Sequence, residues 1–138
     1  MFIEHVNLVV KNLDNSLRFY GSAFPDWKVR GGGHDKWHGK ARQWLHFGDE
    51  HQYLAFSDHG EGENRDLSGH TPGLAHFAFA VSNLEAVRQR LQAVGFEPSK
   101  LGSDTPFRSN LYFIDPDGFE VEFVQYHSDI VAQRNDYH

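Results

Sequence analysis

Two histidines and one glutamate are the side chains of this sequence best suited to metal chemistry. His5 and His76 each open a segment of strand-like alternation, and Glu122 lies in a third such segment. Neutral imidazole is the commonest metal ligand, and two histidines with one carboxylate suit a divalent ion (Fe²⁺, Mn²⁺, Zn²⁺ or Ni²⁺) with open coordination positions. A metal with open positions can chelate a substrate's oxygens or activate a bound water. We therefore predict one metal per site at His5, His76 and Glu122.

An internal repeat gives the two histidines equivalent positions. Residues 5–14 (HVNLVVKNLD) match residues 76–85 (HFAFAVSNLE) without a gap, with identities at the His, Val, Asn and Leu. Each copy predicts an alternating strand followed by an amphipathic helix that begins at an Asn-Leu-acid sequence. We expect these helices at about Asn12–Ala23 and Leu84–Val94, with Gly95 as the stop of the second.

Three strand-like stretches follow each helix. In the first half we expect them at about Trp27–Arg30, Arg42–Phe47 and Gln52–Ser57, with a mobile rim loop around Gly31–Gly39. In the second half we expect them at about Phe96–Ser99, Asn110–Ile114 and Phe119–Tyr126, with Asp115-Pro116-Asp117-Gly118 as a hairpin turn. The pattern predicts one α+β domain of residues 1–138, built of two βαβββ modules (1–58 and 74–126), a polar linker (59–73) and a C-terminal tail (127–138).

Alternation places the three candidate ligands on the face opposite the helices. The apolar side chains expected on the helix side are Val6, Leu8, Val10, Phe77, Phe79, Val81, Phe119, Val121 and Phe123. His5, His76 and Glu122 alternate with these apolar residues and should therefore point to the opposite face of the sheet. When the two halves of the repeat are aligned, Ala55 takes the position of Glu122. The first half therefore has no carboxylate where symmetry would place a fourth ligand. We predict three protein ligands, although Ala55 could also mark a lost activity.

Further polar and aromatic side chains share the predicted face of the sheet. Arg42, Trp44 and His46 are spaced two residues apart, so they should point to the same face of one strand. Asn7 lies two residues from His5 and should share its face. We predict that His46 takes part in acid–base catalysis, because its ordinary pKa is about 6.5. Asn7, Arg42 and Trp44 are predicted substrate contacts. Of the other histidines, we expect those in turn or linker sequence to face solvent: His51, His59 and His70.

Composition excludes several classes of function. The chain has 138 residues, a formal charge of −6 and no cysteine, so disulfides, thiolate metal sites and cysteine nucleophiles are excluded. Its 13 basic residues form no stripe of the kind that nucleic-acid binders carry. No apolar run approaches the roughly 18 residues of a membrane span, and the N-terminus lacks signal-peptide features. We expect a cytoplasmic protein that binds a small molecule.

At His5, His76 and the segment 115–122 (DPDGFEVE), the chain resembles the vicinal oxygen chelate superfamily. That superfamily includes glyoxalase I, extradiol dioxygenases, fosfomycin-resistance proteins and bleomycin-resistance proteins, and the resemblance covers about residues 2–126. It implies paired βαβββ modules that enclose a cup-shaped mixed sheet with helices on the outer face, a homodimer, and a divalent metal at the positions of His5, His76 and Glu122. It also implies that Tyr112 hydrogen-bonds a metal-bound substrate.

The resemblance favours some chemistries over others. Glyoxalase I typically has a fourth ligand on the strand that holds Ala55, which counts against glyoxalase chemistry. Extradiol dioxygenases use a His-His-Glu iron site, which fits the three ligands. Their further acid–base histidine is missing, because it would fall on Ser103, Asp104 or Thr105.

Fosfomycin-modifying enzymes also use His-His-Glu ligands, and the candidates for their cationic phosphonate contacts are Arg42, Lys100 and Arg108. Bleomycin-type binders generally lack the metal ligands. We therefore expect a metal-dependent enzyme with dioxygenase-like chemistry favoured. A fosfomycin-type thiol transferase, a glyoxalase-like lyase and a non-catalytic protein that binds a small ligand such as an antibiotic are the alternatives.

Overall fold

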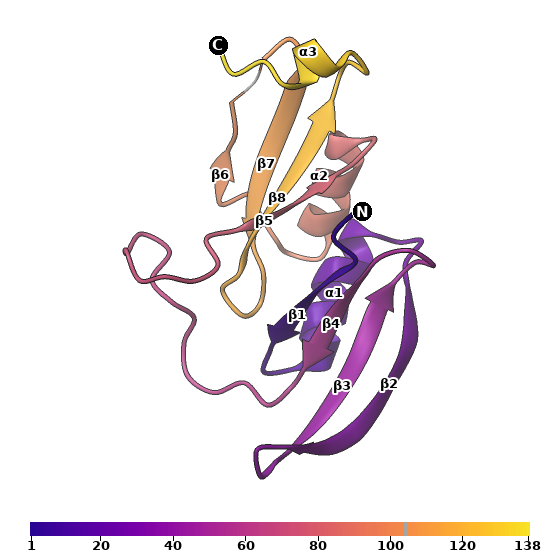
Figure 1. Cartoon of the computed structure of the whole chain (residues 1–138), viewed down its shortest axis with the longest axis vertical. Coiled ribbons are helices and arrows are strands. Elements are labelled where there is room, and N and C mark those ends of the chain that lie inside the picture. Colours follow the sequence, from indigo (N-terminus) through magenta and orange to yellow (C-terminus); the bar gives the residue numbers. More distant parts are fainter. Residues whose placement is uncertain (104) are drawn as a thin grey trace. The chain divides into compact units, whose positions relative to one another are not determined.

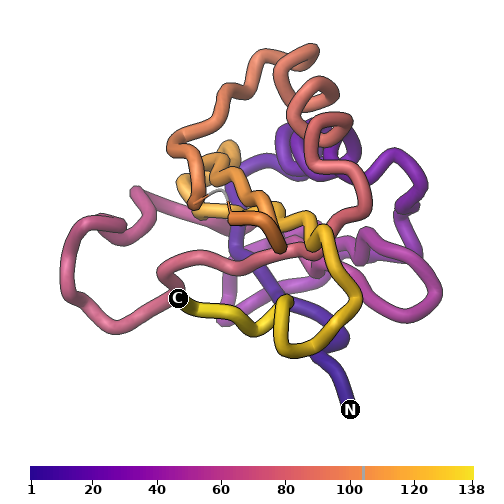
Figure 2. The backbone as a smooth tube through the Cα atoms, turned by 90° about the horizontal axis from the view of Figure 1, so that it is seen from above, coloured from indigo at the N-terminus to yellow at the C-terminus, as the bar shows by residue number. Residues whose placement is uncertain are grey.

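The two copies of the repeat fold into separate units, Met1–Glu63 and Asn64–His138. The computed structural model describes residues 1–103 and 105–138. Asp104, one of the positions where the dioxygenase histidine would fall, lies outside the described residues. Residues 58–76, which join the last strand of the first unit to the first strand of the second in the sequence, contain no helix or strand and are drawn as a winding loop (Figures 1 and 2).

The first unit has the βαβββ order that the sequence predicts. Its elements are β1 (His5–Val9), α1 (Leu13–Ala23), β2 (Lys28–Trp37), β3 (Lys40–Gly48) and β4 (Tyr53–Ser57). The strands form one mixed sheet in the order β1-β4-β3-β2, in which β1 runs parallel to β4 and the other pairs are antiparallel.

The second unit repeats this topology. Its elements are β5 (Phe77–Ala80), α2 (Leu84–Ala93), β6 (Lys100–Leu101), β7 (Arg108–Ile114), β8 (Glu120–Tyr126) and the short α3 (Val131–Arg134) in the tail. The sheet order is β5-β8-β7-β6, with β5 parallel to β8. The α+β class and the two βαβββ modules are confirmed. No helix in the described residues is long and apolar enough to cross a membrane.

The asparagines shared by the two repeats are helix N-caps. The Asn12 side chain accepts a hydrogen bond from the Asn15 backbone N–H at 2.9 Å, and that of Asn83 accepts one from Ala86 at 3.0 Å. Each cap satisfies a backbone donor that the first helical turn leaves unpaired. Gly95, at φ 93°, ends the second helix in the left-handed region that glycine favours.

Alternation along the strands follows the prediction. On the helix side Leu8, Val10, Val121 and Phe123 are buried, while the opposite face of the first strand of each module is exposed, with His5, Asn7, Val9, His76, Ala78 and Ala80. Phe19, Tyr20 and Ala23 of α1 complete the first core, and Leu84, Val87 and Leu91 of α2 complete the second. Each core therefore fixes the face on which the candidate ligands lie.

The predicted mobile loop around Gly31–Gly39 is wrong. Strand β2 continues through it to Trp37 and pairs with β3, after a register shift between Val29 and Gly31. Glycine lets β2 lie close to β3, because a Cβ at Gly32 would lie 2.5 Å from the Trp44 carbonyl oxygen. The hairpin turns at His38 and Gly39, both with positive φ.

One smaller expectation also changes, and another is confirmed. Phe96–Ser99 is not a strand, and the short β6 follows it at Lys100–Leu101. Pro98 lies in that stretch and has no N–H to donate to a ladder. The turn at Asp115–Gly118 is confirmed, because the Gly118 N–H donates to the Asp115 carbonyl at 3.1 Å and Gly118 has φ 82°.

Candidate metal and substrate site

The turn before β8 positions Glu122 without itself contributing chemistry. The Asp115 side chain is buried, and its Oδ1 accepts hydrogen bonds from the backbone N–H of Asp117 at 2.8 Å and of Phe119 at 3.0 Å. Asn64 donates to the Asp117 carbonyl at 3.1 Å from outside the turn. These bonds fix where β8 begins and therefore which face Glu122 occupies.

In the second unit, His76 and Glu122 converge. His76 directly precedes β5, which lies beside β8 in parallel register. The His76 Nε2 lies 3.1 Å from Glu122 Oε2, while its Nδ1 lies 3.8 Å from Glu120 Oε1. The Glu122 side chain is 15% exposed and that of His76 is 39% exposed, so both can be reached by a small ligand. One imidazole nitrogen and one carboxylate oxygen thus point to a common position.

Asn110, which the sequence analysis did not single out, holds the other oxygen of Glu122. Its Nδ2 donates to Glu122 Oε1 at 2.9 Å and approaches the Tyr112 hydroxyl at 3.3 Å. Its Oδ1 is buried and makes no hydrogen bond in the described part of the structure. A Cβ at Gly102 would collide with this amide, so a glycine there makes room for it. Asn110 therefore occupies Oε1 of Glu122, and the other oxygen, Oε2, is the one that faces His76 Nε2.

Tyr112 is the cross-strand neighbour of Glu122 in the β7–β8 ladder. Its ring meets that of His76 edge-on, with centroids 5.6 Å apart, and the Lys100 ammonium lies 4.5 Å from its centroid. Burial, together with the Glu122 carboxylate, raises the pKa of Tyr112. The phenol therefore stays protonated at neutral pH and can donate a hydrogen bond, as its predicted role requires.

In the first unit, His5 stands at the repeat-equivalent position of His76. Its Nδ1 lies 2.9 Å from Glu4 Oε1, and its ring stacks on Tyr53 with centroids 4.6 Å apart. A ligating histidine almost always gives its second ring N–H to a carboxylate or carbonyl, which fixes the tautomer. His5 has such a carboxylate at hydrogen-bond distance from Nδ1, which leaves its Nε2 for a metal. In His76 the nearest carboxylate to Nδ1 is Glu120 at 3.8 Å, and Nε2 is the nitrogen that faces Glu122.

The donor set fits a divalent metal, but it is divided between the units. Within the described residues, neither unit alone gathers three His, Asp or Glu side chains that could hold an ion. The register confirms that Ala55 is the equivalent of Glu122, because Ala55 pairs with Asn7 as Glu122 pairs with Ala78. The first sheet thus offers a methyl group where a fourth ligand would stand.

Four predicted site residues of the first unit line one pocket. It has a volume of about 230 Å³ and opens on the face of the sheet opposite α1, and Asn7, Arg42, Trp44 and His46 all border it, together with Asp35, Ala55, Phe56 and Ser57. Ala55 is the register partner of both Asn7 and His46. Its small side chain therefore leaves the hollow between them.

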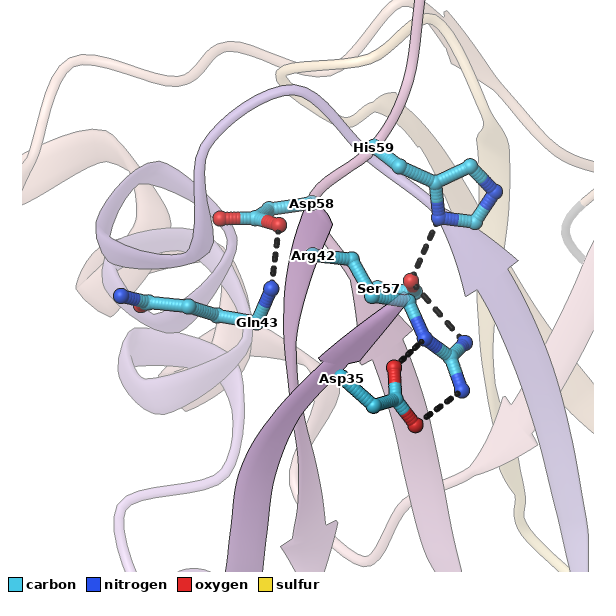
Figure 3. A network of polar contacts seen from close by, with 6 residues as sticks. All are labelled: Asp35, Arg42, Gln43, Ser57, Asp58 and His59. Carbon is cyan, nitrogen blue, oxygen red and sulfur yellow. Dashed lines mark hydrogen bonds and ion pairs between the residues drawn. The ribbon is translucent and has the colours of Figure 1, made fainter. Parts of the chain in front are cut away.

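A polar network fixes Arg42 at the edge of this pocket (Figure 3). Its Nε donates to Asp35 Oδ1 at 2.6 Å and one terminal nitrogen donates to Oδ2 at 3.3 Å, while the other donates to Ser57 Oγ at 3.2 Å. The Ser57 hydroxyl lies 2.6 Å from His59 Nδ1. The hydrogen bond with Asp35 raises the pKa of Arg42 and lowers that of Asp35, so both stay charged.

The wall of the pocket continues as a row of stacked rings. The His46 ring lies 5.2 Å from Trp44 and stacks on Tyr53 at 4.4 Å, and Tyr53 in turn stacks on His5. Burial, assisted by the charges of His5 and Arg30, lowers the pKa of His46. His46 is therefore neutral at pH 7, which is the form that a general base needs.

Other predicted residues lie elsewhere. Arg108 donates to the Arg134 carbonyl at 3.3 Å and its guanidinium carbon lies 5.4 Å from the Tyr137 ring, so it contacts the tail, and its role as a substrate contact stays a prediction. Lys100 pairs with Glu120 at 3.2 Å.

Among the remaining histidines, His51 and His70 are exposed as predicted. The expectation that His59 faces solvent is wrong, because it is half-buried against Ser57.

Comparison with known proteins decides the family. The model of the Glyoxalase/Bleomycin resistance protein/Dioxygenase superfamily matches residues 2–123. The chain belongs to this superfamily. No curated protein matches its sequence.

Solved structures place the chain among superfamily members of the same size. It is 26% identical to a glyoxylase/bleomycin resistance protein/dioxygenase domain from Frankia sp. EAN1pec, with a TM-score of 0.73 over 92% of this chain and 98% of that one. It is 25% identical to a glyoxalase family protein from Enterococcus faecalis, with a TM-score of 0.70 over 89% and 96%. The fosfomycin resistance protein FosX from Listeria monocytogenes, solved with Mn(II) and sulfate, shares the fold at 18% identity, with a TM-score of 0.65 over 98% of each chain.

Proposed function

We propose that this superfamily member is a divalent-metal-dependent enzyme of the vicinal oxygen chelate type, with His5, His76 and Glu122 as the metal ligands. The observation that supports it best is the convergence of His76 Nε2 and Glu122 Oε2, 3.1 Å apart. When bound, the metal supplies a Lewis acid that chelates two substrate oxygens and stabilises the negative charge that develops on them. Fe²⁺, Mn²⁺, Zn²⁺ and Ni²⁺ all suit these donors, and the Mn(II) of FosX makes Mn²⁺ the first ion to try.

The chain's own residues then orient the substrate and move its protons. Tyr112, protonated at neutral pH, donates a hydrogen bond to a substrate oxygen. Asn7, Arg42 and Trp44 hold the organic part of the substrate in the pocket of the first unit. His46, neutral at pH 7, accepts a proton from the substrate at its ring nitrogen.

Dioxygenase-like chemistry is the reaction class that we favour, because the His-His-Glu set resembles that of extradiol dioxygenases. Thiol addition to an epoxide and a glyoxalase-like lyase reaction are the alternatives. The test is turnover by metal-loaded protein with a panel of catechols under oxygen and of epoxides with a thiol. We expect consumption of oxygen with a catechol, abolished in His76→Ala and retained in His70→Ala, which removes an exposed histidine instead.

A non-catalytic binding protein is the second candidate, because every residue that lines the described pocket belongs to the first unit and none of them is a proposed metal ligand. It predicts saturable binding of a small ligand with no consumption of oxygen, thiol or substrate. Turnover that disappears in His76→Ala would exclude this candidate. Saturable binding that is unaffected by that variant, without turnover, would favour it over the enzyme.

The resemblance also implies a homodimer, and the composition a cytoplasmic location. Both stay proposals. Light scattering on the eluted chromatographic peak tests the first directly, with twice the 15.8 kDa chain mass as the expected result. A mass of one chain would contradict it.

A further inference from the structure

The pocket of the first unit has the dimensions of a single substituted ring. Its volume is about 230 Å³. An engineered apolar cavity of about 150 Å³ takes up benzene, so this pocket accommodates one ring with a substituent or a small fused pair.

Its walls are flat and held in place. The Trp44 ring lies against β2, where a Cβ at Gly33 would approach the ring to 3.1 Å, so glycine lets it pack closely. His46, two residues further along the same strand, lies with its ring 5.2 Å from that of Trp44 and is stacked on Tyr53. Ala55, the cross-strand partner of His46, contributes only a methyl group to the lining. Two neighbouring aromatic rings beside a small side chain favour a planar ligand, which can stack on them.

The charge of the pocket is balanced from within. Arg42 is the only Lys or Arg among the lining residues, and Asp35 binds the fork formed by its Nε and one terminal nitrogen, which is the geometry that would otherwise receive an anionic ligand. The Arg42 side chain is 16% exposed and that of Asp35 is 47% exposed, so a ligand can reach the Asp35 carboxylate. An entering carboxylate or phosphonate would meet the Asp35 carboxylate and would have to displace it. The pocket should therefore reject anions.

Hydrogen-bond donors remain in the pocket to orient a ligand. Asn7 supplies an amide at the border of the pocket. The described contacts of Arg42 use three of its five N–H groups, so it can still donate to a carbonyl or hydroxyl. These donors suit an oxygen substituent on the ring.

We propose that this pocket selects an uncharged planar group of the substrate, one ring in size and carrying a hydrogen-bonding oxygen, and that Asp35 makes it discriminate against anions. The inference rests on the proposed function only in treating this guest as part of the substrate. The binding itself involves no metal ligand.

The test compares benzamide with benzoate, which have the same shape and differ in charge. Binding of each to the ¹⁵N-labelled full chain is followed by NMR at about pH 8, where ordinary histidines with a pKa of about 6.5 are neutral. We expect benzamide to shift the Trp44 indole and Asn7 amide signals and to bind about tenfold more tightly than benzoate, because the benzoate carboxylate would meet that of Asp35. Equal or tighter binding of benzoate, or no binding of benzamide at these signals, would overturn the proposal.

Asp35→Asn isolates the source of the selectivity. It leaves Arg42 unneutralised, so benzoate should bind about tenfold more tightly than to the wild type while benzamide is unchanged. Asp26→Asn removes the same charge from an exposed position outside the pocket and should change neither. If Asp35→Asn leaves benzoate binding as weak as in the wild type, Asp35 is not the discriminating group. The wild-type comparison stands even if this variant does not fold.

A metal-ligand variant separates this proposal from the proposed function. His76→Ala, in the other unit, should keep the preference for benzamide whether or not the chain binds a metal. If the wild type takes up no metal but keeps the preference for benzamide, only the proposed enzyme is rejected. If the wild type takes up a metal but shows no preference for benzamide over benzoate, only the proposed selectivity of the pocket is rejected.

Discussion

At the scale of single residues, the neighbouring side chains decide which atoms of the proposed ligands remain for a metal. Glu4 lies beside Nδ1 of His5, and Asn110 donates to Oε1 of Glu122. What remains is Nε2 of His5, Nε2 of His76 and Oε2 of Glu122, and the last two already lie 3.1 Å apart. The neighbours of the proposed ligands therefore determine which of their atoms can bind a metal.

Asn110→Ala tests this positioning role. Without the amide, Glu122 can rotate, so Mn²⁺ affinity measured by electron paramagnetic resonance should fall by about tenfold, the lower end of the range for groups that orient a ligand. Asn15→Ala, an exposed position in α1, removes the same amide and should leave the affinity unchanged. An unchanged affinity in Asn110→Ala, with the fold intact by circular dichroism, would mean that Asn110 does not orient Glu122.

The Asp35–Arg42 pair makes a second prediction, on pH. Because Arg42 lowers the pKa of Asp35 in the folded protein, the pair stabilises the fold fully above the ordinary carboxyl pKa of about 3.9 and loses that effect as the pH falls. The carboxyl carbon of Asp35, followed by NMR, should titrate below this value in the wild type. In Arg42→Gln the midpoint should rise toward it, and identical midpoints would show that the pair does not form.

At the scale of elements, the hairpin of β2 and β3 positions most of the pocket. Its register sets Asp35 opposite Arg42 and Gly33 opposite Trp44. Gly32 and Gly33 let this long strand lie close to its partner. The hairpin is therefore part of the site and not a covering loop.

Two alanine substitutions in the same glycine run test this role. A Cβ at Gly32 would lie 2.5 Å from the Trp44 carbonyl oxygen, whereas one at Gly31 would meet nothing within 4 Å. Gly32→Ala should lower the free energy of unfolding by about 1–3 kcal/mol, as overpacking does. Gly31→Ala should change it by less than about 1 kcal/mol. Urea denaturation measures both, and equal effects would contradict the packing role of Gly32.

The same hairpin marks the limit of prediction from the sequence. The repeat predicted both helices because each copy carries an Asn that caps a helix, and the turn at 115–118 was predicted because its residues form turns. Alternation then placed Asn7, Arg42, Trp44 and His46 on one face, and the structure gathers them. Three successive glycines, however, have no side chains to show alternation. A run of glycines therefore predicts a loop, and the cross-strand pairing of Asp35 with Arg42 does not follow from the sequence.

Two other site residues were missed for a different reason. Asn110 acts through a hydrogen bond to Glu122, and Tyr53 through ring stacking between His5 and His46. Both contacts depend on which strands are neighbours and in which register. Tyr53 opens β4 and is the register partner of His5, so a correct β1–β4 pairing would have revealed it.

At the scale of the whole molecule, the proposed ligands are divided between the two units: His5 belongs to the first, and His76 and Glu122 belong to the second. A metal that binds only the folded protein stabilises it, by about 2.7 kcal/mol at a hundred times its Kd. Mn²⁺ should therefore raise the melting temperature of the wild type and leave that of His76→Ala unchanged. An equal rise in both would indicate binding at other groups.

The most direct test of the central claim is the metal content of the protein, by elemental analysis after purification without chelators or a histidine tag and after reconstitution with Mn²⁺. We predict close to one divalent ion per site in the wild type. The ion should be lost in His76→Ala and in the double variant His5→Ala/Glu122→Ala, while circular dichroism shows the fold retained, because these side chains contribute little to either core. No bound metal and no uptake on reconstitution would contradict the metal site and leave a binding pocket in the first unit as the better account.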